Sequence, residues 1–216
     1  MTLRCMLFDL DGTLVDTAPD LGHAANFVRE SLGQAPLPLA DYRPVASAGA
    51  RGLLGKALGI GPEHPDFPRH RDVFLDHYRA NLSRASCLFP QMDEALRAME
   101  RSGIRWGVVT NKPAWLTRPL MAELGLDSRS AVTVSADEVA RPKPAPDSLY
   151  KACEMLGLAP TDCVYVGDDR RDIDAGRAAG MRTIAADWGY LGEGGPIEGW
   201  GADAILRTPE ELQGWL

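Results

Sequence analysis

The chain of 216 residues lacks the features that mark several large classes of protein. It contains no apolar run near the ~20 residues that a membrane-spanning helix needs. Its first apolar run begins at residue 4, which leaves no room for a signal peptide. Acidic residues outnumber basic ones, giving a net charge of −7 and no basic stripe to neutralise nucleic-acid phosphates. We therefore expect a cytoplasmic protein that binds neither membranes nor nucleic acids.

Cysteine is scarce, and one familiar glycine motif is missing. The four cysteines are Cys5, Cys87, Cys153 and Cys163, and they show no CxxC or other metal-ligand spacing. Buried free thiols in a reducing compartment are therefore expected. No GxGxxG follows the first apolar run, where a dinucleotide-binding fold requires it, and this absence argues against an oxidoreductase.

The sequence does contain a regular alternation of short apolar runs and segments of helical periodicity. The apolar runs are 4–9, 104–110, 131–135, 163–167 and 182–186, with a weaker one at 202–206. The helical segments are 91–102, 114–124, 146–157, 171–179 and 208–215. A capping box of Thr208 and Glu211 is predicted to open the last one. Such alternation is typical of an α/β fold, a doubly wound, Rossmann-like parallel sheet covered by helices.

The alternation is interrupted between residues 16 and 86, where no strand pattern occurs. Helical patterns begin with a predicted capping box at Thr17 and Asp20 and continue near 50–58 and 67–82. We therefore expect an α/β core domain of residues 1–15 and 87–216. An all-helical domain of residues 16–86 is inserted into it after the first strand.

Two aspartates separated by one residue, Asp9 and Asp11, stand at the end of the first apolar run. Carboxylates at a strand end of an α/β sheet point into the crevice where ligands bind. Two acids this close repel each other unless a cation lies between them or one carries a proton. A hard divalent ion such as Mg²⁺ suits oxygen ligands, so the pair indicates a metal site. The same residues also fit a strand followed by an Asp-Gly turn.

Three later segments carry residues suited to phosphate chemistry. Thr110 and Asn111 offer a hydroxyl and a backbone N–H at a strand end, although they also fit an ordinary helix N-cap. Lys143 stands between two prolines that stiffen its loop. A further apolar run ends in a cluster of acids, namely Asp168, Asp169 and Asp172.

Taken in order, these four segments resemble the motifs of the haloacid dehalogenase superfamily of phosphatases: DxDGT, a strand-end Thr or Ser, a Lys, and GDxxxD. The resemblance runs from Asp9 to Asp172. It implies a Rossmann-like core, a helical cap where the insertion falls, and Mg²⁺-dependent hydrolysis of a phosphomonoester. Asp11 points to phosphate chemistry because a halide leaves unprotonated, so a dehalogenase needs no acid there. A mutase of the β-phosphoglucomutase type shares the same motifs and is an alternative.

The resemblance also implies roles for the acidic residues. Asp9 would attack phosphorus to form an aspartyl phosphate, and Asp11 would protonate the leaving alcohol and then activate water. Asp9, the backbone carbonyl of Asp11 and Asp168 would hold the metal. Asp172 would lie behind them and orient a metal-bound water or the lysine. Asp169 is expected either to contact metal-bound water or to cap the following helix.

The remaining core residues are expected to bind the phosphate. Thr110, Asn111 and Lys143 would contact its non-bridging oxygens, which carry the charge in a loose transition state.

Arg170 and Arg171 are expected to be solvated helix residues. The glycine-rich segment 189–195 lacks the context of a phosphate loop and is predicted to be a surface loop.

One cap residue, Arg51, is a candidate for substrate recognition. A cation near a helix N-terminus opposes the helix dipole, at a cost of about 0.3–1 kcal/mol. A bidentate grip on a substrate carboxylate would explain this placement, although a solvent-facing arginine fits it too. Within the superfamily the chain looks most similar to phosphoglycolate phosphatases, so 2-phosphoglycolate is the first expectation. N-acetylmuramic acid 6-phosphate, which also carries a carboxylate, and other sugar phosphates are the alternatives.

A non-enzymatic interpretation is also open. A metal-dependent phosphate binder or a phosphoacceptor of the receiver type likewise uses an aspartate at a strand end. Such a domain needs neither a leaving-group acid at Asp11 nor a cap, which favours the enzyme. We expect a small phosphorylated metabolite as the partner and a monomer or homodimer as the assembly.

Overall fold

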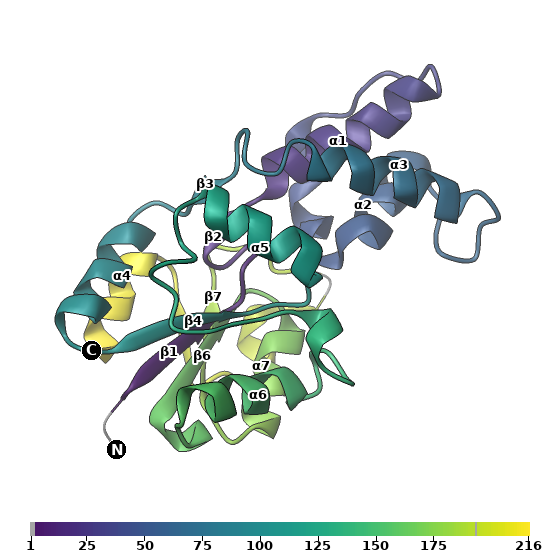
Figure 1. Ribbon diagram of the computed structural model, residues 1–216. Helices are drawn as coiled ribbons and strands as arrows, with labels where there is room; N and C mark the ends of the chain where they lie inside the picture. The colour runs from purple at the N-terminus through teal and green to yellow at the C-terminus, as the bar shows by residue number, and fades with distance from the viewer. Residues whose placement is uncertain (1–2, 193) are drawn as a thin grey trace.

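The computed structural model describes residues 3–192 and 194–216 and is built around a parallel β-sheet (Figure 1). Its six strands follow the order β5-β4-β1-β6-β7-β8. They are β1 (Cys5–Phe8), β4 (Arg105–Val109), β5 (Thr133–Val134), β6 (Cys163–Gly167), β7 (Arg182–Ala186) and β8 (Ala204–Leu206). The predicted α/β fold is confirmed, and the runs ending at Asp9, Thr110 and Asp168 lie side by side and parallel.

Helices cover both faces of the sheet, which explains why its inner strands are apolar throughout. They are α4 (Met92–Arg101), α5 (Ala114–Glu123), α6 (Asp147–Leu156) and α7 (Arg170–Ala178). Met6 and Phe8 of β1 face the core formed with α4 and α5, whereas Cys5 and Leu7 face the core formed with α6 and α7. This follows from the two-residue period of a strand. No helix in the described part of the chain is long and apolar enough to cross a membrane.

The last predicted helix is a 3-10 segment, Pro209–Trp215, and not an α-helix. Its predicted capping box does not form, since the Thr208 side chain makes no cap hydrogen bond. The Glu211 carboxylate instead accepts from the N–H of Arg207, one residue before the expected partner, at 3.0 Å. The segment is anchored to the core by the buried side chain of Leu212.

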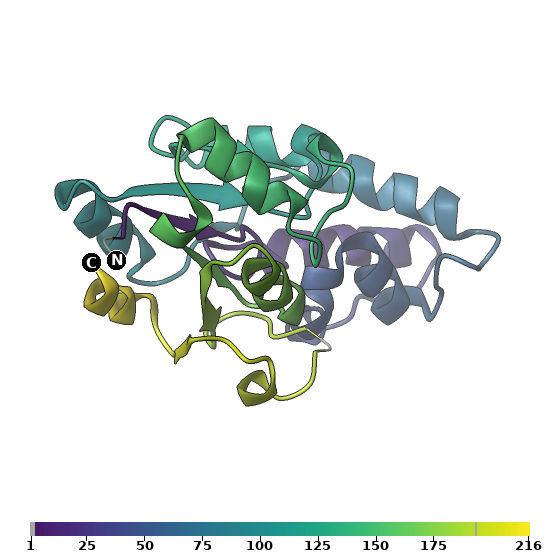
Figure 2. The ribbon, with the colours of Figure 1, turned by 90° about the horizontal axis from the view of Figure 1, so that it is seen from below.

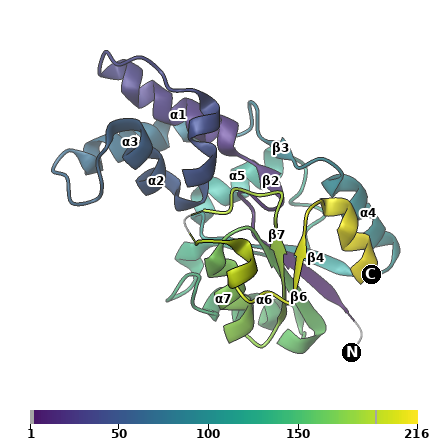
Figure 3. The ribbon, with the colours of Figure 1, turned by 180° about the vertical axis from the view of Figure 1, so that it is seen from behind.

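The inserted region between β1 and β4 consists of helices joined by turns (Figures 1 and 3). Its α-helices are α1 (Ala18–Ser31), α2 (Gly49–Leu58) and α3 (Phe67–Arg79), with 3-10 turns at Leu39–Asp41 and Arg43–Ala48. The chain leaves and re-enters the core through two short antiparallel strands, β2 (Val15–Asp16) and β3 (Cys87–Leu88). In Figure 2 this region lies at the end of the core opposite the C-terminal segment. It therefore sits over the carboxyl ends of the strands, where the candidate site lies.

The capping box predicted at the start of α1 does not form either. The Thr17 hydroxyl donates to Oδ1 of Asp11 at 2.6 Å. The Asp20 carboxylate is 3% exposed and accepts from the N–H groups of Ala85 and Ser86, and from the Ser86 hydroxyl, at 2.7–3.1 Å. A buried carboxylate needs several donors, and this connection supplies more of them than one helix turn does. Asp20 therefore ties the two connections of the insertion together.

Candidate active site

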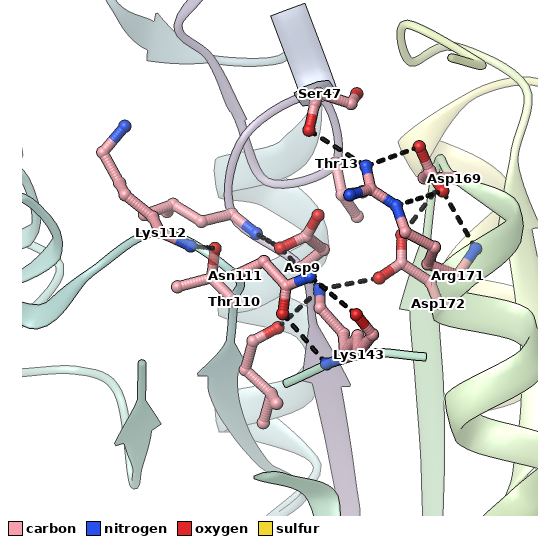
Figure 4. Close-up of polar contacts among 12 residues, drawn as sticks. Asp9, Thr13, Ser47, Thr110, Asn111, Lys112, Lys143, Asp169, Arg171 and Asp172 are labelled. Carbon is pink, nitrogen blue, oxygen red and sulfur yellow. Dashed lines mark hydrogen bonds and ion pairs between the residues drawn. The ribbon is translucent and has the colours of Figure 1, made fainter. Parts of the chain in front are cut away.

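The carboxyl ends of three neighbouring strands bring the predicted core residues together. Phe8 of β1 pairs with Val108 on one side and Val166 on the other, so the residues that follow these strands are neighbours. They line a cavity of about 490 Å³ between the sheet and the insertion. The predicted residues that line it are Asp9, Asp11, Thr110, Asn111, Lys143, Asp169 and Asp172. Figure 4 shows most of them converging on one point.

Three buried carboxylates lie close together at this site. Asp9, Asp168 and Asp172 each place one oxygen within 4.8 Å of the others. Burial, together with the neighbouring charges of Asp9 and Asp172, raises the pKa of Asp168 well above its usual value. A cation among the three would remove this repulsion. The oxygen donors fit a hard divalent ion, and Asp172, which we placed behind the metal ligands, belongs to the same cluster.

The backbone around the cluster leaves room for these acids. A Cβ on Gly12, whose φ is +89°, would lie 2.2 Å from Oδ2 of Asp168, and a Cβ on Gly167 would lie 2.3 Å from the Asp172 side chain. The Thr13 hydroxyl donates to Asp168 Oδ1 at 2.7 Å. Gly167 therefore makes space for Asp172, and the carboxylate of Asp168 is held in a fixed orientation.

Lys143 supplies a positive charge to two acids of the cluster. Its Nζ lies 2.9 Å from Oδ1 of Asp9 and 2.7 Å from Oδ1 of Asp172, and its side chain is 2% exposed. Burial alone would lower the pKa of this amine, but the carboxylates of Asp172 and Asp9 raise it above its usual value. The lysine is therefore charged and shared between two acids.

The loop that carries Lys143 is held by the side chain of Asn111. The Asn111 amide donates to the backbone carbonyl of Lys143 at 2.9 Å and accepts from its backbone N–H at 3.0 Å. We expected Asn111 to act through its own backbone N–H. The two hydrogen bonds of its side chain give it an additional role. The Thr110 oxygen accepts the backbone N–H of Lys112 at 3.1 Å, so its hydroxyl hydrogen can point toward the cavity.

Lys112 is a site residue that the sequence reasoning missed. Its Nζ lies 2.9 Å from Oδ1 of Asp11 and donates to the hydroxyl of Tyr78 on α3 at 2.8 Å. Burial favours the neutral amine, but Asp11 raises the pKa of Lys112 above its usual value. Burial also raises the pKa of Tyr78 to about 12, so that hydroxyl stays protonated. The only signal in the sequence was a third polar residue after the strand, following Thr110 and Asn111.

Asp169 occupies the helix-cap position, one of its two expected places. It is the N-cap of α7, and its carboxylate accepts the N–H of Arg171 at 2.9 Å while its own N–H donates to Asp172 at 3.1 Å. The prediction that Arg171 is simply solvated is wrong. Its guanidinium pairs with Asp169 at 2.8 Å and donates to the carbonyl of Ser47 in the insertion at 3.0 Å. Arg170 is largely exposed, as expected.

The structure does not bring Arg51 into this cavity. Arg51 lies in the first turn of α2 and is exposed, and it lines a separate cavity of about 230 Å³ beside α7. Ala50 of the same segment lines the active-site cavity instead. Each helical residue is rotated by about 100° from the previous one, which turns neighbouring side chains in different directions. An arginine of the insertion that does line the active-site cavity is Arg71 on α3.

Tyr190 corrects the prediction of a surface loop at 189–195. Its N–H donates to Oδ2 of Asp168 at 2.9 Å, and its hydroxyl accepts the N–H groups of Thr17 and Ala18 at 2.7 and 2.8 Å. The side chain is buried, so this part of the segment links the acid cluster to the start of the insertion. Glu193, in the same segment, lies outside the described residues.

The structure is an α/β fold with a helical insertion over the carboxyl ends of its parallel strands, and three carboxylates at this edge could together hold a metal ion. The chain belongs to the haloacid dehalogenase-like hydrolase family, whose model matches residues 3–180. It is an enzyme of the phosphatase branch of this family, as its curated relatives show.

Two of these relatives carry different substrate names. The chain is 41% identical to N-acetylmuramic acid 6-phosphate phosphatase of Pseudomonas aeruginosa, with 98% of this chain and 94% of that protein covered. It is 42% identical to phosphoglycolate phosphatase of Xanthomonas campestris pv. campestris, with 97% and 94% covered. Among solved structures, a predicted phosphoglycolate phosphatase of Haemophilus somnus superposes with a TM-score of 0.87 at 26% identity, covering 100% of this chain and 98% of that one.

Proposed function

We propose that this protein hydrolyses phosphomonoesters in a Mg²⁺-dependent reaction through an aspartyl phosphate on Asp9. The observation that carries the proposal is the cluster of Asp9, Asp168 and Asp172, in which Asp9 and Asp172 share the Lys143 ammonium and line the cavity. Residues 1–15 and 87–216 form the catalytic core in this proposal, and residues 16–86 form its cap. Asp9, Asp168 and the backbone carbonyl of Asp11 would hold Mg²⁺. When bound, the ion would screen the negative charge of the nucleophile from that of the phosphate.

In the first step an oxygen of Asp9 attacks phosphorus, and the bond between phosphorus and the leaving oxygen breaks. The leaving oxygen takes a proton from the carboxyl group of Asp11 and departs as an alcohol. In the second step water attacks phosphorus, gives its proton back to Asp11, and releases inorganic phosphate and the free Asp9 carboxylate. Asp11 is placed for both transfers because it lines the same cavity as Asp9.

The other polar residues stabilise the phosphate through both steps. The Lys143 ammonium lies beside Asp9, and the Thr110 hydroxyl lines the cavity, so both can bind non-bridging oxygens. Their positions are set by buried contacts before the substrate arrives, and such preorganised donors account for a large part of enzymatic rate enhancement. Asn111 contributes by holding the loop of Lys143.

The substrate class we propose is a small phosphorylated metabolite that carries a carboxylate. 2-Phosphoglycolate, expected from the sequence, and N-acetylmuramic acid 6-phosphate both belong to this class, and each is named by a relative. A mutase would return an isomeric sugar phosphate, whereas a phosphatase releases inorganic phosphate.

The test is release of inorganic phosphate from p-nitrophenyl phosphate by EDTA-treated protein, before and after addition of Mg²⁺. We expect no turnover in EDTA and full recovery with Mg²⁺. Wild-type turnover by metal-free protein, or none with Mg²⁺, would overturn the proposal. A panel of phosphorylated metabolites, read by phosphate release and by product identity, then separates phosphatase from mutase.

A further inference from the structure

The cations that line the active-site cavity differ in what they already bind. Lys143 is shared by Asp9 and Asp172, Lys112 is paired with Asp11, and Arg171 is paired with Asp169. Each of these pairs satisfies an acid of the core. Among the cavity-lining cations of the described chain, only Arg71 is paired with no such acid.

Among the residues that the structure describes, Arg71 has one ionic partner, the carboxylate of its sequence neighbour Asp72, at 3.0 Å. The two side chains are 47% and 64% exposed, and a solvent-exposed pair of this kind is weak. A substrate carboxylate can therefore compete for the Arg71 guanidinium. The planar guanidinium suits a carboxylate, which it can bind through two parallel hydrogen bonds.

The same face of α3 presents apolar groups to the cavity. Arg71, Phe74, Leu75 and Tyr78 follow the spacing of one helix face, and all four line the cavity. Trp115 at the start of α5 lines it as well and is 41% exposed. Its ring is held by the Arg79 guanidinium, which lies 5.7 Å from the ring centroid. An exposed aromatic side chain inside a cavity is a surface on which a ligand can pack.

The size of the cavity also bears on the ligand. Its volume of about 490 Å³ lies within the ~300–1,000 Å³ that holds ligands larger than a simple acid. A phosphorylated two-carbon acid would occupy the phosphate site and leave the face of α3 and Trp115 without contact. A pyranose ring bearing a carboxylate side chain would fill both.

Building on the proposed phosphatase function, we propose that the preferred substrate is a phosphorylated sugar acid whose carboxylate is bound by Arg71. The sugar ring packs against Phe74, Leu75 and Trp115, and its phosphate lies at Asp9. Arg71 is thus the residue that selects for the carboxylate, in place of Arg51, which lines the other cavity. In this arrangement the substrate extends from the acid cluster toward α3.

The test compares two substrates that share the sugar ring and the phosphate and differ in one carboxylate-bearing group. N-acetylmuramic acid 6-phosphate carries a lactyl group that N-acetylglucosamine 6-phosphate lacks. We expect the wild-type protein to prefer the first in kcat/KM, and to prefer it over 2-phosphoglycolate. Arg71→Gln should lower kcat/KM for the sugar acid by about ten- to a hundredfold, since it removes a charge-assisted pair. Hydrolysis of N-acetylglucosamine 6-phosphate and p-nitrophenyl phosphate should change less than twofold.

Two further variants make the result specific. Arg51→Gln is the matched control, an exposed arginine of the same insertion that lines the other cavity, and it should leave all substrates unchanged. Trp115→Ala should lower kcat/KM for both sugar phosphates equally, because both carry the ring. An equal loss on all substrates in Arg71→Gln, no loss on any, or a wild-type preference for 2-phosphoglycolate would overturn this inference. In each of those outcomes Mg²⁺-dependent hydrolysis of p-nitrophenyl phosphate would still stand, so the proposed function is tested separately.

Discussion

Replacing Lys143 with Met should destabilise the protein strongly as well as inactivate it. The substitution leaves the carboxylates of Asp172 and Asp9 without their shared ammonium, in a place where the Lys143 and Asp172 side chains are 2% and 1% exposed. Breaking a buried ion pair by removing one partner costs about 3–5 kcal/mol. For a chain of this size each kcal/mol corresponds to about 2–4 °C, so Tm should fall by about 6–20 °C.

The loss of stability in the Lys143→Met variant should be smaller at acidic pH. Burial, opposed in part by Lys143, raises the pKa of Asp172 to about 6, and without Lys143 that pKa rises further. At a pH between the ordinary pKa of an aspartate and this raised value, Asp172 is protonated in the native state and ionised in the unfolded chain. The stability of the Lys143→Met variant therefore increases as pH falls from 8 through 6, and is lost as pH rises through the raised pKa.

Thermal unfolding in EDTA, followed by circular dichroism at several pH values, measures both effects. The variant Lys143→Met/Asp172→Asn should recover more than half of the lost stability, because it removes the acid left unpaired. A Tm within 2 °C of wild type for Lys143→Met at pH 8, or a double variant less stable than the single one, would refute the argument. Turnover should fall by about 10²–10³ in either variant.

Three other substitutions test the remaining roles. Asp9→Asn should abolish turnover while the circular dichroism spectrum stays native, because the amide cannot attack phosphorus; a wild-type rate would remove Asp9 as the nucleophile. Lys112→Met should slow hydrolysis of alkyl phosphates more than that of p-nitrophenyl phosphate, since placement of Asp11 matters most where the leaving group needs a proton. An equal loss on both substrates in kcat measurements would contradict that role. Asp168→Asn should shift the Mg²⁺ titration of activity by at least about ten- to a hundredfold, since substitution of residues that only orient metal ligands already gives shifts of this size; an unchanged midpoint would exclude it as a ligand.

Local patterns in the sequence were enough to predict the core of this protein. Buried parallel strands need continuous apolar runs, and a glycine often follows a helix because it tolerates a left-handed backbone, as Gly125 and Gly157 do with φ of +66° and +63°. Because parallel strands end at the same edge of a sheet, the polar residues after them had to converge. The apolar runs thus predicted that Asp9, Thr110 and Asp168 lie at one edge of the sheet, and the strand order β4-β1-β6 makes them neighbours.

The partners of individual polar side chains were decided by the tertiary structure. Asp20 looked like a helix cap and instead binds Ser86, while Lys112 meets a tyrosine of α3 and Tyr190 reaches Asp168 from a loop. Arg51 and Arg71 both lie in predicted helical segments of the insertion. Of these two, only Arg71 lines the active-site cavity. A buried polar group binds whichever donors or acceptors the fold brings within about 3 Å, and those are often far away in the chain. Spacing along a sequence determines the periodicity of an element, but its position against other elements determines which side chains can meet.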